Sequence, residues 1–122
     1  IFNPLNSFLK MKKIEAIIRK SVFDDVRKAL HEIEVNFFSY WDVTGVGNEQ
    51  KGRVYRGVSY STADIPRRHL SIIVSDSFVE KTIDVILKHA YTGEVGDGKI
   101  FVIPVDDAIR IRTQERGTQS LQ

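Results

Sequence analysis

The chain has 122 residues, of which 42% are hydrophobic and 28% are charged, a composition typical of one globular domain rather than a disordered segment. Eighteen lysines and arginines against sixteen acidic residues leave a formal charge of +2, too small to indicate a nucleic-acid-binding protein by itself. The absence of cysteine excludes disulfides, thiolate metal sites and a cysteine nucleophile. No apolar run approaches the roughly 20 residues that span a bilayer, so we expect a soluble, cytoplasmic protein.

The first ten residues stand apart from the rest of the chain. Met11 is the only methionine, and regular apolar patterning begins just after it. Residues 1–10 lack the cationic start and long apolar core of a signal peptide. We interpret them as an N-terminal extension, which is a cloning remnant, an upstream extension of the reading frame, or a linker from a larger chain.

The first three elements are expected between residues 13 and 45. Alternating apolar side chains over 13–19 predict a half-buried strand. Apolar residues then recur at helical spacing over 22–33, where Ser21 is the expected N-cap and two early aspartates suit the positive end of the helix dipole. Aromatic and β-branched residues over 36–45 predict a second strand.

A long segment without apolar periodicity, residues 46–64, separates the second strand from the remaining elements. Loops of this length are uncommon in compact domains and are usually functional. After it the pattern predicts a strand over 69–74, a helix over 76–91 and a strand over 99–105. A short helical turn is expected at 106–108, before a basic tail.

The element order βαββαβ predicts an α+β, ferredoxin-like fold, with a four-stranded antiparallel sheet and two helices on one face. The expected strands also place apolar residues on the other face, among them Ile17, Ile73 and the aromatic residues of 37–41. A sheet that is apolar on both faces needs cover on both, so we expect an oligomer that packs sheet against sheet.

Two patterns suit the binding of a phosphate chain. In the turn Gly96-Asp97-Gly98-Lys99, glycines allow backbone amides to approach phosphate oxygens and the lysine adds a point charge, although the motif alone favours a tight helix-to-strand connection. If the segment Arg110-Ile111-Arg112 is extended, its two guanidinium groups share a face and suit a polyphosphate. The alternative is a pair of solvated arginines.

The sequence carries few candidates for catalysis. Its three histidines, at positions 31, 69 and 89, are not spaced as metal ligands, and no serine lies in a nucleophile elbow. We therefore expect no enzyme. The strand end Gly45-Val46-Gly47 leads into a loop with tyrosine and arginine side chains, which are frequent at protein-binding hot spots, although the loop could also lack a partner.

Four segments together resemble the PII nitrogen-regulatory proteins. They are residues 11–18, the loop motif Tyr55-Arg56-Gly57-Val58-Ser59-Tyr60, the motif TGEVGDGKIFV over 92–102, and the closing stretch 109–113. The resemblance covers residues 11–118 and leaves 119–122 as a C-terminal tail. It implies a homotrimer of ferredoxin-like subunits that binds ATP or ADP between subunits and is not an enzyme.

The resemblance also implies roles for single residues. The nucleotide side would comprise Gly45, Val46, Gly47, Ile73, Gly96, Asp97, Gly98, Lys99, Arg110 and Arg112. Gln50 aligns with the family's glutamine that meets Mg²⁺ and 2-oxoglutarate, although Glu49 is the alternative. Arg67 stands where the family often has a lysine that contacts 2-oxoglutarate.

The segment 46–64 corresponds to the family's T-loop, which docks on ammonium transporters or nitrogen-metabolism enzymes. Tyr55, Arg56 and Gly57 match its tip, and Tyr60 matches the tyrosine that is uridylylated in some bacterial members. The residues just before Tyr60 are Val-Ser instead of the common Ala-Glu. Contact with a membrane, at its inner face, is expected only through a transporter partner, to which residues 1–10 would tether the domain if they are a linker.

Two other functions compete with this interpretation. A ferredoxin-like RNA-binding module would stack bases on the aromatic strand 37–41, but the modest charge and the apolar second face argue against nucleic acid. A small nucleotide-hydrolysing enzyme would need a base and a nucleophile that the pattern does not supply.

Overall fold

The computed structural model describes residues 10–48, 54–55, 58–59 and 62–121. Its main sheet has the strand order β2-β5-β1-β6 with antiparallel neighbours, and β3 and β4 pair separately. The elements are β1 (Met11–Ile18), η1 (Lys20–Val22), α2 (Phe23–Glu32), β2 (Ser39–Asn48), β3 (Val54–Tyr55), β4 (Val58–Ser59), β5 (Thr62–Ser75), α3 (Asp76–Ala90), β6 (Lys99–Val105) and η2 (Gly117–Leu121). This arrangement confirms the predicted ferredoxin-like α+β fold.

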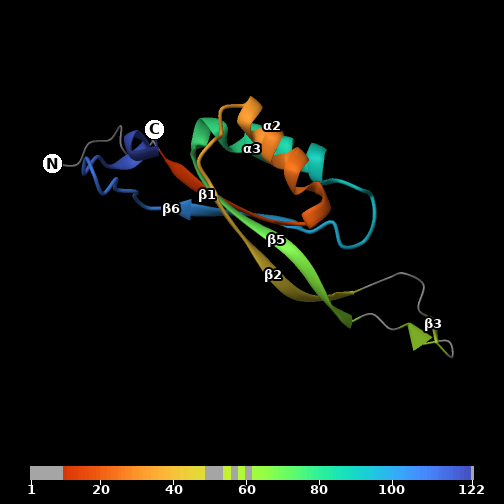
Figure 1. Cartoon of the computed structure of the whole chain (residues 1–122). Coiled ribbons are helices and arrows are strands. Elements are labelled where there is room, and N and C mark those ends of the chain that lie inside the picture. Colours follow the sequence, from red (N-terminus) through yellow and green to blue (C-terminus); the bar gives the residue numbers. More distant parts are fainter. Residues whose placement is uncertain (1–9, 49–53, 56–57, 60–61, 122) are drawn as a thin grey trace.

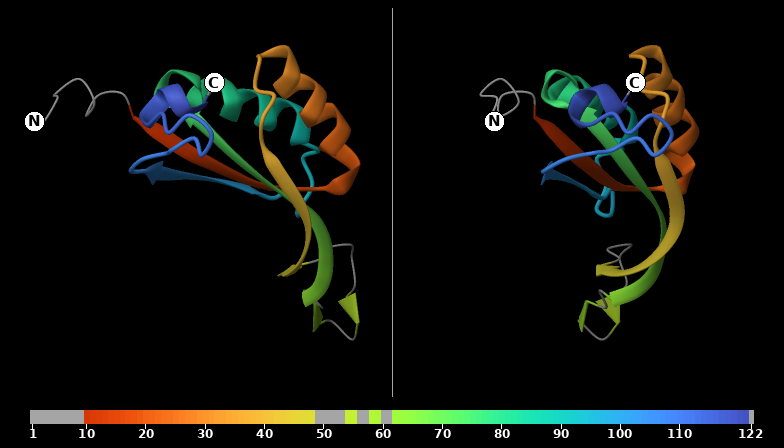
Figure 2. Two further views of the ribbon diagram at one scale, coloured as in Figure 1. Left: turned by 60° about the vertical axis from the view of Figure 1, so that its left-hand side comes forward. Right: turned by 90° about the vertical axis from the view of Figure 1, so that its left-hand side faces the viewer.

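The two helices α2 and α3 lie side by side on one face of the sheet (Figures 1 and 2). The period-two pattern of β1 sends alternate side chains toward them, because successive residues of a strand point to opposite faces. The core between sheet and helices is apolar and almost completely buried. Its largest fully buried side chains are Ile14, Ile18, Val26, Leu30, Leu70, Ile72, Thr82 and Ile86.

The start of α2 differs from the expectation. Ser21 is not the N-cap, because residues Lys20–Val22 form a 3-10 turn and Val22 occupies the capping position without a side-chain hydrogen bond. Asp24 and Asp25 do lie in the first turn of the helix, where the dipole favours negative charge.

The sheet face that the helices leave open is mixed rather than purely apolar. The indole of Trp41 stacks on the His69 ring, with centroids 4.4 Å apart, and Phe101 and Ile103 of β6 are 46% and 39% exposed. Tyr40, by contrast, packs toward the helix layer against the ring of Phe23. The expectation that the aromatic run lies on the open face is therefore wrong for Tyr40, and for Phe38, which also packs against the core.

Strands β2 and β5 are longer than predicted and leave the sheet together as a two-stranded ribbon, drawn in olive and green in Figure 1. Their pairing continues through Gly45↔Ile65 and Gly47↔Ala63 to Asn48↔Thr62. Both ends of the predicted loop 46–64 are therefore strand. The sequence pattern did not predict these strand ends, because the glycine and polar residues of the ribbon face no core and therefore show no apolar alternation.

The segment after β6 also differs from the prediction. Residues 106–108 are not helical, and an isolated bridge between Ile109 and Arg116 closes a turn over 111–113. The segment Arg110-Ile111-Arg112 is thus not extended. Within the part of the chain that the structure describes, no helix is both long and apolar enough to cross a membrane.

Candidate functional site in two halves

The loop between α3 and β6 is organised by Asp97. Its carboxylate accepts hydrogen bonds from the Thr92 hydroxyl, from the Thr92 and Gly93 amides at 2.8 and 2.9 Å, and from Arg19 Nε at 3.1 Å. These donors, the Thr92 hydroxyl first, hold the pKa of Asp97 well below its usual value. The carboxylate therefore stays ionised, and its hydrogen bonds hold the two ends of the loop together.

Two glycines of this loop are required by its geometry. Gly98 has φ +104°, and a Cβ there would lie 1.7 Å from the Ile17 carbonyl oxygen. Gly96 has φ +98°, and its Cβ would lie 2.8 Å from Arg67 Nη2. Only glycine fits either position without moving backbone or guanidinium groups.

Two arginines fix the carbonyl groups of the same loop. Arg67 Nε and Nη2 donate to the Gly96 carbonyl at 3.2 and 2.8 Å, and Arg19 Nη2 donates to the Val95 carbonyl at 2.9 Å. Arg67, predicted to bind 2-oxoglutarate, therefore reaches the glycine-rich turn. The sequence analysis did not predict a role for Arg19. Its position could have suggested one, because β1 ends beside the point where the loop between α3 and β6 leads into β6.

The remaining predicted residues of this half lie at the same end of the sheet. Lys99 begins β6 and pairs with Ile17, and its side chain is exposed. Gly45 and Gly47 lie on the ribbon, and a Cβ at Gly45 would meet no atom within 4 Å. We call residues 45–47, 67 and 96–99 together the glycine end.

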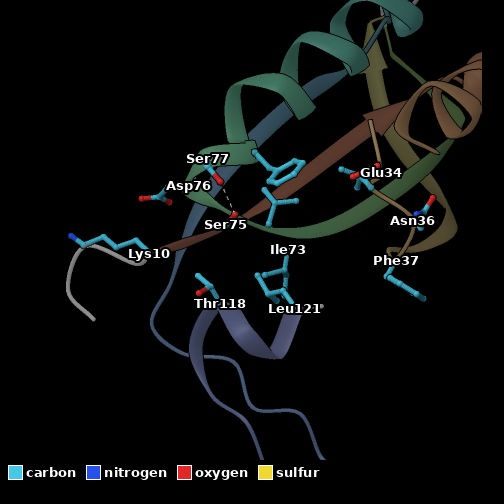
Figure 3. Close-up of a pocket in the computed structure, with 13 residues that line it drawn as sticks. Lys10, Glu34, Asn36, Phe37, Ile73, Ser75, Asp76, Ser77, Thr118 and Leu121 are labelled. Atoms are coloured by element: carbon cyan, nitrogen blue, oxygen red, sulfur yellow. Dashed lines mark hydrogen bonds between the residues drawn. The ribbon is translucent and has the colours of Figure 1, made fainter. Parts of the chain in front are cut away.

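A cavity of about 470 Å³ marks the opposite end of the sheet. Ile73, 38% exposed, lines it and faces Thr118 and Leu121 of η2 across the opening (Figure 3). Phe37, 83% exposed, lines the cavity ahead of β2. Phe37, Thr118 and Leu121 were missed, because Phe37 was assigned to a strand and Leu121 to a tail outside the domain.

The two predicted arginines follow β6 at this same end. Arg110 Nη2 donates to the Ser120 carbonyl at 3.3 Å, and its Nη1 lies 3.9 Å from Glu115. Arg112 is exposed and makes no polar contact with the described residues. We call Ile73, residues 110–112 and η2 together the arginine end.

One chain keeps the two ends apart. Ile73 pairs with Lys13, whereas Lys99 pairs with Ile17, and Ile73 lies six positions after Arg67 along β5. At about 3.3 Å per residue this amounts to roughly 20 Å. Figure 1 shows the separation directly, with the cyan loop and the blue C-terminal segment at opposite ends of the molecule. No ligand the size of a phosphate group touches both ends of one chain.

Several predicted residues cannot be placed. Glu49, Gln50, Arg56, Gly57 and Tyr60 lie outside the described residues. Of the loop tip only the backbone of Tyr55 is described, in β3, which pairs with β4. Within the described ranges, no group of three or more His, Asp or Glu side chains could hold a metal ion.

Comparison with known proteins identifies the family. The family model "Nitrogen regulatory protein P-II" matches residues 11–115. Among its relatives, the nitrogen regulatory protein P-II of Azospirillum brasilense is 42% identical over 113 residues, covering 91% of this chain and all of the relative. P-II 1 of Escherichia coli is 45% identical over 107 residues, covering 86% of this chain and 95% of the relative.

Solved structures share the fold at similar coverage. A B. subtilis GlnK–ATP complex superposes with a TM-score of 0.76 at 28% identity, covering 91% of this chain and 97% of that one. Arabidopsis thaliana PII bound to citrate gives a TM-score of 0.73 at 36% identity, covering 91% and 89%. The family model and the full-length relatives agree with the fold, and this chain belongs to the nitrogen regulatory protein P-II family.

Proposed function

We propose that this P-II protein is a signalling homotrimer, without enzymatic activity, that binds ATP or ADP between its subunits. Nucleotide and 2-oxoglutarate would control the T-loop, residues 46–64, and through it a target. The expected target is an ammonium transporter, with a nitrogen-metabolism enzyme as the alternative.

One observation carries the nucleotide site: the candidate residues fall into two halves that a single chain holds roughly 20 Å apart. A second subunit placed head to tail would bring its arginine end to the first subunit's glycine end. Such heterologous contacts close into a ring when the rotation fits. A trimer would then hold three sites, each with one half from each neighbour.

The chemistry of the joined halves suits an adenine nucleotide. Ile73 and Leu121 offer apolar surface for a base, while Lys99, Arg110 and Arg112 supply three cations for a phosphate chain. The ATP complex of B. subtilis GlnK supports this assignment by similarity. Mg²⁺ would enter with ATP, bound by its phosphate oxygens and by Gln50, and would link the phosphates to the T-loop.

The second effector would bind beside the phosphate turn. Arg67 already touches the Gly96 carbonyl, so its guanidinium lies where an anion could join the nucleotide site. The citrate complex of the Arabidopsis protein supports a carboxylate ligand by similarity. A ligand that prefers one T-loop conformation changes target affinity by the same differential free energy.

Calorimetric titration with ATP tests the nucleotide site. The parent protein should bind about one ATP per subunit, and the Arg110→Ala/Arg112→Ala double variant should lose at least tenfold in affinity because two phosphate cations are gone. Arg27→Ala, which removes an exposed arginine on α2 away from both ends, is the control and should bind as the parent does. No binding to the parent protein contradicts the proposal.

Mixing variants tests whether two chains share each site. Lys99→Ala and Arg112→Ala subunits, each weak alone, are co-expressed with different tags and the doubly tagged trimers are isolated. In each such mixed trimer one of the three sites combines two intact halves and recovers parental affinity. If each site belonged to one chain, no mixture would recover any.

The T-loop target is tested separately. Inverted membrane vesicles carrying an ammonium transporter should retain the protein, and Arg56→Ala should abolish retention if the loop tip docks on the transporter. Retention that is unchanged in Arg56→Ala, or equal on vesicles without the transporter, contradicts this part of the proposal. The RNA-binding alternative gains no support, since Trp41 is stacked on His69 and Tyr40 packs on Phe23.

A further inference from the structure

An apolar groove lies between α3 and the edge strand β6, in contact with the phosphate turn. Its volume is about 560 Å³, and its floor includes Ile18 and Ile86, which are 2% and 1% exposed. Leu87, Tyr91 and Val102 line it and are 55%, 75% and 44% exposed. Gly98 and Lys99 also line the groove, so it opens directly beside the glycine end. Nothing in the described part of the chain covers these side chains.

An apolar side chain without cover also lies at the arginine end. Ile111 is 94% exposed, the most exposed large hydrophobic residue described. It lies in a braced turn, because the Arg110 amide donates to Glu115 and the Gln114 amide donates back to Arg110. At the start of this turn the Asp107 carboxylate accepts hydrogen bonds from the Ala108 and Gly117 amides. The turn thus holds Ile111 outward between its two arginine neighbours.

The chain cannot place its own Ile111 in its own groove. The strand β6 runs from Lys99, beside the groove, to Val105, and the braced turn follows beyond that far end. Figure 1 shows the turn and the loop ahead of Lys99 at opposite ends of the molecule. Ile111 can therefore enter such a groove only on another subunit.

We infer that Ile111 of one subunit packs into the α3–β6 groove of the next, and so sets Arg110 and Arg112 beside the neighbour's Lys99. The inference rests on the proposed function, which requires the same two ends to meet. The two features are otherwise independent, since one is a groove at the glycine end and the other a bare side chain at the arginine end.

The contact explains how three cations can gather before a nucleotide arrives. Lys99, Arg110 and Arg112 repel one another, so charge alone would keep the two ends apart. Burial of Ile111 does not depend on charge and would hold them together. A polyphosphate would then relieve the repulsion, so nucleotide and the Ile111 contact strengthen each other.

The absence of cysteine makes cross-linking a direct test. The variant Ile111→Cys/Leu87→Cys is oxidised with copper phenanthroline and run on a non-reducing gel. It should form disulfide-linked dimers and trimers, faster with ATP. In the control Ile111→Cys/Glu80→Cys, the helix cysteine lies seven residues, about 10 Å, nearer the start of α3 and should cross-link far less. Equal or absent cross-linking in the two pairs overturns the inference.

A second pair of variants avoids reliance on disulfides. Ile111→Ser should weaken ATP binding about tenfold, whereas Ile111→Val should stay within about twofold, because valine still fills the groove. Equal affinities contradict the inference. A parent that binds ATP and passes the mixing test but shows no Ile111 effect leaves the proposed function standing, while a monomeric parent without ATP binding removes both.

Discussion

At the scale of single residues, the loop between α3 and β6 shows two different constraints. Asp97 is fixed by what it accepts, since its oxygens receive hydrogen bonds from Thr92, Gly93 and Arg19. Gly98 is required because it has no side chain, since a Cβ at this position would clash with the Ile17 carbonyl oxygen. The first constraint is electrostatic and varies with pH, while the second is steric and does not.

Replacing Asp97 tests the electrostatic constraint. Asp97→Asn should lower the free energy of unfolding by about 1–2 kcal/mol near pH 7, because the amide offers one acceptor atom instead of two and carries no charge. The folded pKa of Asp97 lies below its unfolded value, so its contribution is present above the unfolded pKa and is lost as pH falls. The difference from the parent should be constant above about pH 5 and shrink below about pH 4.

Urea denaturation across this pH range measures the difference. Asp84→Asn is the matched control, because Asp84 is exposed on α3 and makes no polar contact with the described residues. It should change the free energy of unfolding by less than about 0.5 kcal/mol at every pH. A deficit in Asp97→Asn that persists unchanged at pH 3 would contradict an electrostatic origin.

Alanine at two glycines tests the steric constraint. Gly98→Ala should destabilise the protein by about 3 kcal/mol or more, since its backbone conformation and the Ile17 carbonyl both exclude a Cβ. Gly45→Ala meets no atom and should unfold at the parental temperature, yet bind ATP more weakly if the nucleotide lies against that strand. Differential scanning calorimetry and ATP titration separate the two effects. Equal melting temperatures for the two variants would contradict the steric reading.

At the scale of elements, the sequence predicted most where side chains pack against a core. The alternation in β1 and the helical spacing in α2 and α3 follow directly from contact with one buried layer, and these elements were placed within a few residues. The ribbon of β2 and β5 was missed beyond Gly45 because it packs on nothing. The turn after β6 was missed because hydrogen bonds to Asp107, rather than apolar periodicity, shape it.

The candidate site was likewise predictable where it depends on local sequence motifs and not where it depends on contacts between distant segments. The glycine-rich turn and the arginine pair were predicted from the sequence and by resemblance, but their separation within one chain could be seen only from the strand register. Arg19 and Leu121 were missed because each acts through a contact distant in sequence, with Asp97 in one case and across a cavity from Ile73 in the other.

A deletion variant tests whether the segment beyond the ribbon of β2 and β5 serves target binding rather than folding. Replacing residues 49–61 by Asn-Gly joins Asn48 to Thr62, which are already paired, through a two-residue hairpin turn. Because none of the described core residues lies in the replaced segment, the melting temperature should change by less than about 4 °C. Binding to the target should be lost. A large drop in melting temperature would show that the segment contributes to folding.

At the scale of the whole molecule, the open face of the sheet is the surface on which the proposed trimer can be tested. The paired positions Lys13↔Ile103 and Glu15↔Phe101 place two exposed apolar residues of β6 beside charged residues of β1 on that face. In the proposed trimer this face turns inward, and the ion pair between Lys13 and Glu15, at 2.7 Å, keeps the charges there balanced.

A charge on the open face should therefore break the trimer. The parent should elute with a light-scattering mass near three times 13.9 kDa, while Ile103→Lys should elute as monomer because an unpaired ammonium group cannot be buried between sheets without a large cost. Asp84→Asn also adds one positive unit, but on the helix layer, and should remain trimeric. Circular dichroism should show that the Ile103→Lys monomer keeps its helices, since the core under α2 and α3 is complete within one chain. The monomer should also lose ATP binding, because the proposed site takes one half from each of two subunits. A monomer that binds ATP with parental affinity would place the whole site within one chain.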